Sequence, residues 1–218
     1  MSQEEGVHLQ KGMNFRLGGR HTVILMSLRK GAPYADRIEN DGQVLIYEGH
    51  DIPRRVNGPD PKSMDQPQFN AGGTPTQNGL FFDAAKKFNR NPTTNPEIVK
   101  VYEKIKNGIW VYNGKFRLVD AWIEPSGNRK VFKFRLELTA DESVPNPAFD
   151  IEHERLIPSA IKLDVWKRDA GKCIQCGSAD NLHFDHIIPY SKGGSSLVAE
   201  NIQILCARHN LSKSDRIQ

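Results

Sequence analysis

Alternating apolar and polar positions mark several segments in the first 140 residues as strands. The clearest is "KVFKFRLEL" (130–138), where Phe132, Phe134, Leu136 and Leu138 would share one face and Val131, Lys133, Arg135 and Glu137 the other. This period of two predicts a half-buried strand. Further apolar or β-branched runs predict strands at 21–28, 43–49, 97–105 and 115–124, with turns at "YNGK" (112–115) and "PSGN" (125–128).

Helical spacing appears in two places. In the segment 78–92, apolar residues recur at helical intervals at Phe81, Ala84, Ala85 and Phe88, and Pro92 closes the pattern. The segment 158–173 predicts a second helix, with Ser159 as its N-cap, Ile161, Val165 and Trp166 facing inward and Gly171 at its end. A long stretch rich in Pro, Gly and Asn (51–79) precedes the first helix, and loops of that length are usually functional or mobile.

The chain divides into two parts. Residues 141–156 carry prolines and acidic residues without a sustained period, which predicts a linker between domains at 12–140 and 157–218. With 218 residues, 38% hydrophobic and 26% charged, the composition is that of a globular protein. The run "TVILMSL" (22–28) is too short to span a membrane and the N-terminus is not a secretory signal, so we expect a cytoplasmic protein. The net charge of +4 permits an anionic partner without establishing one.

The cysteines cluster in the last quarter of the chain. The pairs "CIQC" (173–176) and "CARH" (206–209) offer Cys173, Cys176, Cys206 and His209. Three cysteines and a histidine close a tetrahedral structural zinc site, and an odd number of cysteines argues against a disulfide framework. The alternative is buried thiols beside a surface histidine. The zinc hypothesis is favoured because all three cysteines fall into the two pairs.

Between these pairs lies the stretch "FDHIIPYSKGGSSLVAENIQILCARHNLSK", in which Asp185-His186 precedes Asn201 by fifteen residues and Asn210 follows nine residues later. Residues 157–218 resemble the HNH nuclease family, in the variant whose last histidine is replaced by asparagine. The resemblance implies a small zinc-stabilised ββα-metal fold. It also implies His186 as general base, Asp185 and Asn210 as ligands of one Mg²⁺ or Mn²⁺, and Asn201 as the residue that holds the loop or the His186 ring. Lys213 would approach a phosphate or support the helix.

These residue types suit the hydrolysis of a phosphodiester, which needs an activated water and a Lewis acid for the developing charge. His209 stands where many relatives carry a fourth cysteine, so it is predicted to bind zinc. In the alternative, His209 binds the catalytic cation and His183 replaces it at zinc.

The N-terminal part resembles the SRA (YDG) family, which binds modified cytosine by flipping the base out of the duplex. The stretches that carry the resemblance are "GAPYADRIENDGQVLIYEGHD" (31–51), "TQNGLFFDAAKKF" (76–88) and 101–138. One departure is "YNG" (112–114), where the family motif has Asp. The overall expectation is an α+β protein, with an SRA/PUA-like twisted β-barrel and flanking helices followed by the HNH module.

A flipped base needs flat faces to stack on and polar groups for its Watson–Crick edge. The resemblance implies Tyr34 and Tyr47 for stacking and Asp36 as acceptor for the cytosine amino group, with Arg37 as an alternative occupant of that position. Tyr47, inside an apolar strand, is alternatively an ordinary core residue. Arg54, Arg55 and Lys62 are predicted phosphate contacts, with a solvated face as the alternative.

Together the two resemblances imply a type IV-like, modification-dependent restriction endonuclease acting on double-stranded DNA that contains 5-methylcytosine or a related base. A homodimer is expected because one HNH site cuts one strand. The alternatives are a non-cleaving reader of modified DNA and an HNH nuclease or nickase without modification specificity.

Overall fold

The computed structural model describes residues 11–139, 156–189, 192–213 and 217. The predicted linker therefore lies almost wholly outside the described residues. No helix in the described ranges is long and apolar enough to cross a membrane.

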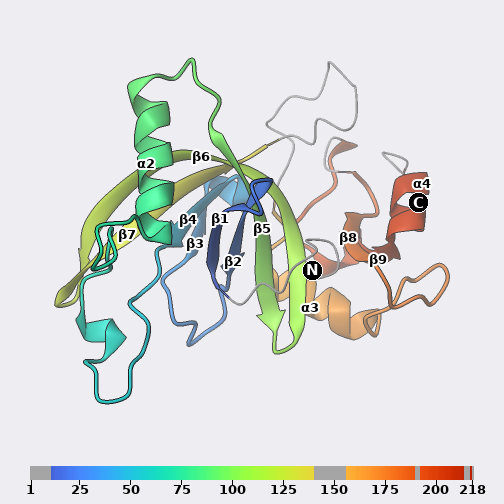
Figure 1. Ribbon diagram of the computed structural model, residues 1–218. Coiled ribbons are helices and arrows are strands. Elements are labelled where there is room, and N and C mark those ends of the chain that lie inside the picture. Colours follow the sequence, from blue (N-terminus) through green and yellow to red (C-terminus); the bar gives the residue numbers. More distant parts are fainter. Residues whose placement is uncertain (1–10, 140–155, 190–191, 214–216, 218) are drawn as a thin grey trace.

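Seven strands of the N-terminal part form one mixed, strongly curved sheet (Figure 1). They are β1 (Met13–Leu17), β2 (His21–Met26), β3 (Arg37–Glu39), β4 (Val44–Glu48), β5 (Glu97–Lys106), β6 (Ile109–Ser126) and β7 (Arg129–Leu138), in the order β1-β2-β5-β6-β7-β4-β3. The β2–β5 pair is parallel and the other pairs are antiparallel. The four predicted strands and the alternating segment all form, whereas the short strands β1 and β3 had no clear signal in the sequence.

Helix α2 (Gln77–Arg90) covers one face of this sheet and matches the predicted helix. Thr76 caps it, because its hydroxyl accepts a hydrogen bond from the Gly79 N–H. Phe81 and Ala85 are fully buried in the core, and the Phe81 ring meets Phe134 of β7 edge to face at 5.7 Å. The 3₁₀ turns η1 (Asn40–Gly42) and η2 (Pro61–Ser63) lie in the connections around β4.

The alternation predicted for β7 is present, but only one of its two faces has the burial expected for it. Phe132, Phe134 and Leu136 are buried in the main core as expected. The opposite face is not solvated near the start of the strand, where Val131 and Lys133 are also buried. An ion pair with Glu48 of β4 accounts for the buried Lys133 ammonium.

The turn predicted at "YNGK" was wrong. The chain reverses instead at Asn107 and Gly108, and β6 runs through 112–115 without interruption. Asn113 and Gly114 form a bulge in β6, since the pairing register with β5 shifts there, and Gly114 has the positive φ of +101° that glycine tolerates. The Asn113 side chain of this bulge is buried.

The C-terminal module contains α3 (Ser159–Arg168), β8 (Leu182–His186), η5 (Ala199–Asn201), β9 (Ile202–Cys206) and α4 (Ala207–Lys213). Strands β8 and β9 form an antiparallel hairpin, which gives a ββα unit with α4. Its core is small, with Val165, Ile202 and Ile204 fully buried. Pro158 rather than Ser159 is the N-cap of α3, because the Ser159 hydroxyl contacts Glu103 instead. The chain as a whole is α+β, as predicted.

Candidate active site and metal centre

The three cysteines and His209 meet in one cluster, as predicted. Their ligand atoms all lie within 4.8 Å of one another. The His209 Nδ1 atom is 3.3 Å from Cys173 Sγ and 3.5 Å from Cys206 Sγ, and the Cys176 and Cys206 sulfurs are 3.9 Å apart. Ligand atoms of a tetrahedral zinc site lie roughly 3.5 to 3.8 Å apart. The cluster therefore fits zinc, and it places His209 with the sulfurs rather than at a catalytic cation.

The Cys173 sulfur has the surroundings of a metal-binding thiolate. Burial raises the pKa of its thiol, but hydrogen bonds from the backbone N–H groups of Cys206, Gln175 and Cys176, together with His209, lower it to about 6. A thiolate is the form that binds a metal ion. The Cys₃His donor set thus supports the zinc site on chemical as well as geometric grounds.

Asp185 and His186 end strand β8 and engage different neighbours. The Asp185 carboxylate accepts a hydrogen bond from Gln203 Nε2 at 2.9 Å and pairs with Lys213 Nζ at 3.1 Å, both at Oδ2. His186 Nε2 is 2.8 Å from the Ser196 hydroxyl. Burial lowers the pKa of His186 and the Lys213 charge lowers it further, whereas Asp185 raises it. The net decrease favours the neutral ring, which can accept a proton.

Asn201 holds the loop that follows β8. Its side-chain oxygen accepts from the Ile188 N–H at 2.8 Å, and its Nδ2 donates to the carbonyls of Ile188 and Ser195 at 3.0 and 3.1 Å. Gly194 closes this loop so tightly that a Cβ there would lie 1.8 Å from the Ile188 carbonyl oxygen. Of the two roles expected for Asn201, the structure shows the contact with the loop, while the His186 ring contacts Ser196.

Helix α4 carries Asn210 and brings Lys213 to the hairpin. Lys213 is almost fully buried, and its ammonium also donates to the His186 carbonyl at 2.6 Å. Asn210 lies one helical turn earlier, so the two side chains are neighbours on the helix.

Sequence reasoning did not identify Gln203 and Ser196, since neither belongs to the motif spacing and both are ordinary polar residues in the sequence.

The predicted base-binding residues lie near one another, because Asp36 accepts a hydrogen bond from the backbone N–H of Glu48, the residue after Tyr47. Tyr47 lies in the hydrophobic core with 2% exposure, and its hydroxyl is 3.2 Å from the Gly12 carbonyl oxygen and 3.3 Å from that of Leu25. Neither face of its ring is open to a base in this structure. Tyr47 is therefore packed as a core residue in this structure, as in the alternative stated for it, and its stacking on a base stays a prediction.

Tyr34 is half-buried, and a cation covers its ring. Lys62 Nζ lies 4.0 Å from the ring centroid and pairs with Asp51 at 2.8 Å, while the Lys62 side chain stays 39% exposed. Arg54 and Arg55 are exposed. Arg37, the alternative to Asp36, pairs with Glu39 at the surface.

Asp36 lies beside Tyr34 with both carboxylate oxygens engaged. They accept hydrogen bonds from the backbone N–H groups of Glu48 at 3.0 Å and Ser27 at 3.3 Å. Burial raises the pKa of Asp36 to about 7 despite these two bonds. Near neutral pH the group is therefore present in both the protonated and the ionised form.

A buried charge network holds the loop that carries Tyr34 and Asp36. Glu48, 3% exposed, pairs with Arg129 at 3.2 Å and with Lys133 at 2.8 Å. It also accepts from the Ala35 N–H, while Lys133 donates to the Ala35 carbonyl. The sequence did not predict this network because its members lie far apart in the chain, on β4 and β7.

Replacing Glu48 by glutamine is expected to lower the free energy of unfolding by about 3–5 kcal/mol, since it leaves two buried cations without their shared carboxylate. Urea denaturation of the whole chain would measure the change. Glu137→Gln is the matched control, because Glu137 pairs with Arg117 and Arg135 on the same sheet but is about one-third exposed. That substitution should cost at most about 1 kcal/mol. Equal losses would contradict the assignment of Glu48 as the centre of a buried network.

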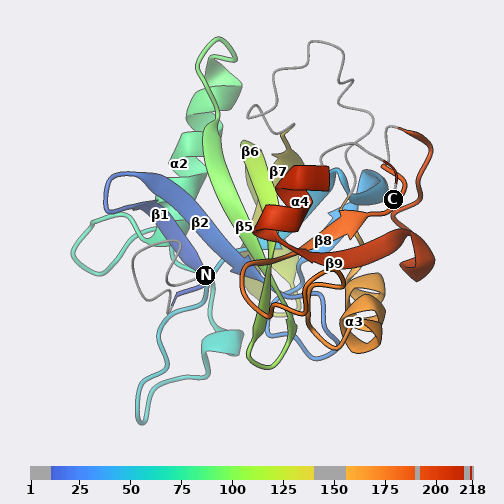
Figure 2. The ribbon, with the colours of Figure 1, turned by 90° about the vertical axis from the view of Figure 1, so that its right-hand side faces the viewer.

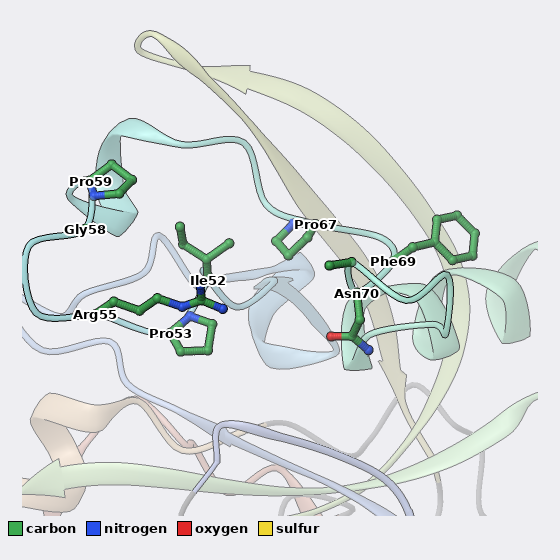
Figure 3. A pocket seen from close by; sticks show the side chains of 9 residues that line it. Ile52, Pro53, Arg55, Gly58, Pro59, Pro67, Phe69 and Asn70 are labelled. Atoms are coloured by element: carbon green, nitrogen blue, oxygen red, sulfur yellow. The ribbon is translucent and has the colours of Figure 1, made fainter.

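A pocket of about 350 Å³ opens in the long segment between β4 and α2 (Figure 3). Its lining is largely apolar, with Ile52, Pro53, Pro59, Pro67 and Phe69 around it and Arg55 and Asn70 as polar members. None of the three predicted base-binding residues lines it.

Comparisons with known proteins found similar solved structures and one matching family model. No curated protein matches. Solved structures with a similar chain include the SUVH5 SRA–fully methylated CG DNA complex (TM-score 0.41, 22% identity, 65% of this chain and 80% of that chain). The SUVH5 SRA complex with hemimethylated CG DNA is similar to the same degree (TM-score 0.41, 24% identity, 66% and 83%). SUVH6 of Arabidopsis thaliana has a TM-score of 0.39 at 19% identity, over 83% of this chain and 28% of that chain. Residues 173–216 match the family model of the HNH endonuclease, and it is to this family that the C-terminal module is similar.

Proposed function

We propose that this chain is a modification-dependent DNA endonuclease that binds 5-methylcytosine or a related modified cytosine in duplex DNA and hydrolyses the backbone nearby. The arrangement at the end of β8 is the main support. There a neutral histidine and an adjacent carboxylate stand beside Lys213, on a hairpin next to a Cys₃His cluster. The match of residues 173–216 to the HNH endonuclease family agrees with this chemistry.

His186 would act as the general base. We assign its Nε2 as the donor to Ser196, which leaves the Nδ1 lone pair to take a proton from the attacking water. The loop pinned by Asn201 carries Ser196, so it keeps the ring in this orientation. Lys213 fixes the end of β8 through the His186 carbonyl.

Asp185 and Asn210 would hold one Mg²⁺ or Mn²⁺. Their oxygen atoms suit a hard cation. Gln203 and Lys213 both bind Oδ2 of Asp185, so Oδ1 is the oxygen that a cation would take. When bound, the cation would stabilise the negative charge that develops on the phosphate and the leaving oxygen. Zinc at the Cys₃His cluster would be structural, because that cluster is closed by four protein ligands.

The specificity for modified cytosine rests on the resemblance of the N-terminal stretches to the SRA family. Of the three residues that it implies, Tyr34 and Asp36 lie on one loop held by buried charges, and we retain them as the base-binding pair. A base that stacks on Tyr34 would have to displace Lys62 from the face that it covers. Two subunits, or two binding events, would be required to cut both strands.

Digestion of four duplexes that differ only in cytosine, 5-methylcytosine, 5-hydroxymethylcytosine and its glucosylated form tests this function. With Mg²⁺ or Mn²⁺ present, we expect cutting of at least one modified duplex and much slower cutting of the unmodified one. Equal cutting of all four would favour an HNH nuclease without modification specificity. Selective binding without cutting, under any divalent cation, would favour a non-cleaving reader.

A further inference from the structure

A buried ion pair joins the C-terminal module to the N-terminal sheet. Lys162 of α3, 3% exposed, lies 2.8 Å from the carboxylate of Glu103 on β5, which is 2% exposed. The Lys162 ammonium also donates to the Asn113 side-chain oxygen at 2.7 Å, and Asn113 Nδ2 donates back to Glu103 at 3.0 Å. The Ser159 hydroxyl contacts the other oxygen of Glu103. Every polar group of this junction is therefore paired within it.

The β6 bulge and α3 supply the two sides of the junction. Asn113 belongs to the bulge that replaces the expected "YNGK" turn, and its amide lies between Glu103 and Lys162. Burial alone would raise the pKa of Glu103, but Lys162, Asn113 and Ser159 together lower it, so Glu103 is charged. Figure 2 shows α3 beside the β5–β6 end of the sheet, with β8, β9 and α4 above it.

A second contact lies just before α3. Leu156 packs against the main core of the sheet domain, whereas Ile157 belongs to the small core of the C-terminal module. Leu156 approaches Gly42 of η1 so closely that a Cβ on Gly42 would lie 2.7 Å from the Leu156 backbone nitrogen. The chain is thus fixed to the sheet domain at two places, one at η1 and one at Glu103.

The interactions at the junction are hydrogen bonds and an ion pair, which depend on the orientation of the two parts. Burying two charges is costly, and an apolar pair of similar volume is often equally stable or more stable. A hydrogen bond requires a defined distance and angle between donor and acceptor, so one ammonium bound to two acceptors restricts the angle between the parts. Domain interfaces within a chain otherwise permit relative motion by default.

We propose that the Glu103–Lys162–Asn113 junction is an orienting device, which fixes the C-terminal module at one angle to the sheet domain. Lys162 and Glu103 are in this sense positioning residues. Given the proposed function, on which this second step rests, the junction sets the distance along the DNA between the bound modified cytosine and the bond that is cut.

The orientation itself can be measured without DNA. Spin labels attached through a noncanonical amino acid at Asp83 of α2 and Leu211 of α4, both exposed, would report the distance distribution between the two parts. We expect one narrow distribution for the parent chain. It should broaden in Lys162→Met and in the double variant Glu103→Leu with Lys162→Met. The double variant carries no unpaired charge, so it keeps the test valid if the single variant fails to fold.

Lys167→Met is the matched control, because Lys167 lies on the same helix but pairs with Asp164 at the surface. It should keep the narrow distribution. A double variant that is as narrow as the parent chain would overturn the proposal, because apolar packing would then be enough to set the angle.

Cleavage supplies a second measurement that a loss of stability alone would not shift. On a duplex with a single modified cytosine, the parent chain and Lys167→Met should share one dominant cut position. The double variant should lose that preference and cut at several positions. An unchanged dominant position would contradict the role of the junction in setting the distance. If the parent chain does not distinguish modified from unmodified DNA, the proposed function fails, while the spin-label distances still decide the orientation.

Discussion

Replacing His186 by alanine is expected to lower the rate of DNA cleavage by about 10²- to 10⁴-fold, the usual contribution of a general base. The reason is local. His186 is the half-buried ring at the end of β8 whose Nε2 is engaged by Ser196 and whose lowered pKa keeps it neutral at pH 7. Single-turnover cleavage of a duplex by a saturating amount of protein would measure the loss. DNA binding should not change, because the substitution lies outside the sheet domain.

His183→Ala is the matched control. His183 lies three residues earlier on the same strand and is also half-buried, but it pairs with Leu205 in the hairpin and is not part of the Cys₃His cluster. It should cut at nearly the parent rate. If His186→Ala cut as fast as the parent chain, the mechanism proposed for the β8 end would be wrong. A comparable loss in both variants would indicate damage to the hairpin instead.

The C-terminal module was predictable from the sequence because its chemistry depends on short spacings. Cys173 and Cys176 belong to one knuckle and Cys206 and His209 to another, and the four meet because the Ile174 N–H of the first knuckle donates to the Ile204 carbonyl of β9. Asp185 and His186 are adjacent in the chain, so their placement at the end of β8 follows from the strand. The contact of Ser196 with His186 could not be predicted from the spacing, because it depends on the path of the loop.

The base-binding region was less predictable, for a physical reason. Tyr47 occupies a strand in which every residue is buried, and the pattern of "VLIYE" does not show which side of the strand faces a ligand. Glu48, in the same strand, is buried only because Arg129 and Lys133 approach it from β7. Such long-range pairing overrides local alternation, and it likewise placed Asn113 in a bulge rather than in a turn.

Replacing Cys176 by serine is expected to abolish zinc binding and to unfold the C-terminal module while the seven-stranded sheet stays folded. The module has a small core, with Val165, Ile202 and Ile204 at its centre, so it cannot offset the conformational entropy of folding by apolar burial alone. Structural zinc sites contribute on the order of 10–16 kcal/mol at pH 7, which exceeds the net stability of most domains of this size. Loss of one ligand thus has a larger effect here than any core substitution.

Metal content and amide hydrogen exchange together test this expectation. One zinc per chain should be found in the parent protein and in Gln175→Ser, a control that changes an exposed side chain between the two cysteines of the same knuckle. In Cys176→Ser the amides of β8 and β9 should lose protection, whereas those of β6 and β7 keep it. If Cys176→Ser retained both zinc and protected hairpin amides, the four ligand atoms within 4.8 Å of one another would not form the metal centre. Removal of zinc from the parent protein by a chelator should reproduce the exchange pattern of the variant, because in both cases the hairpin that carries Asp185 and His186 loses its anchor.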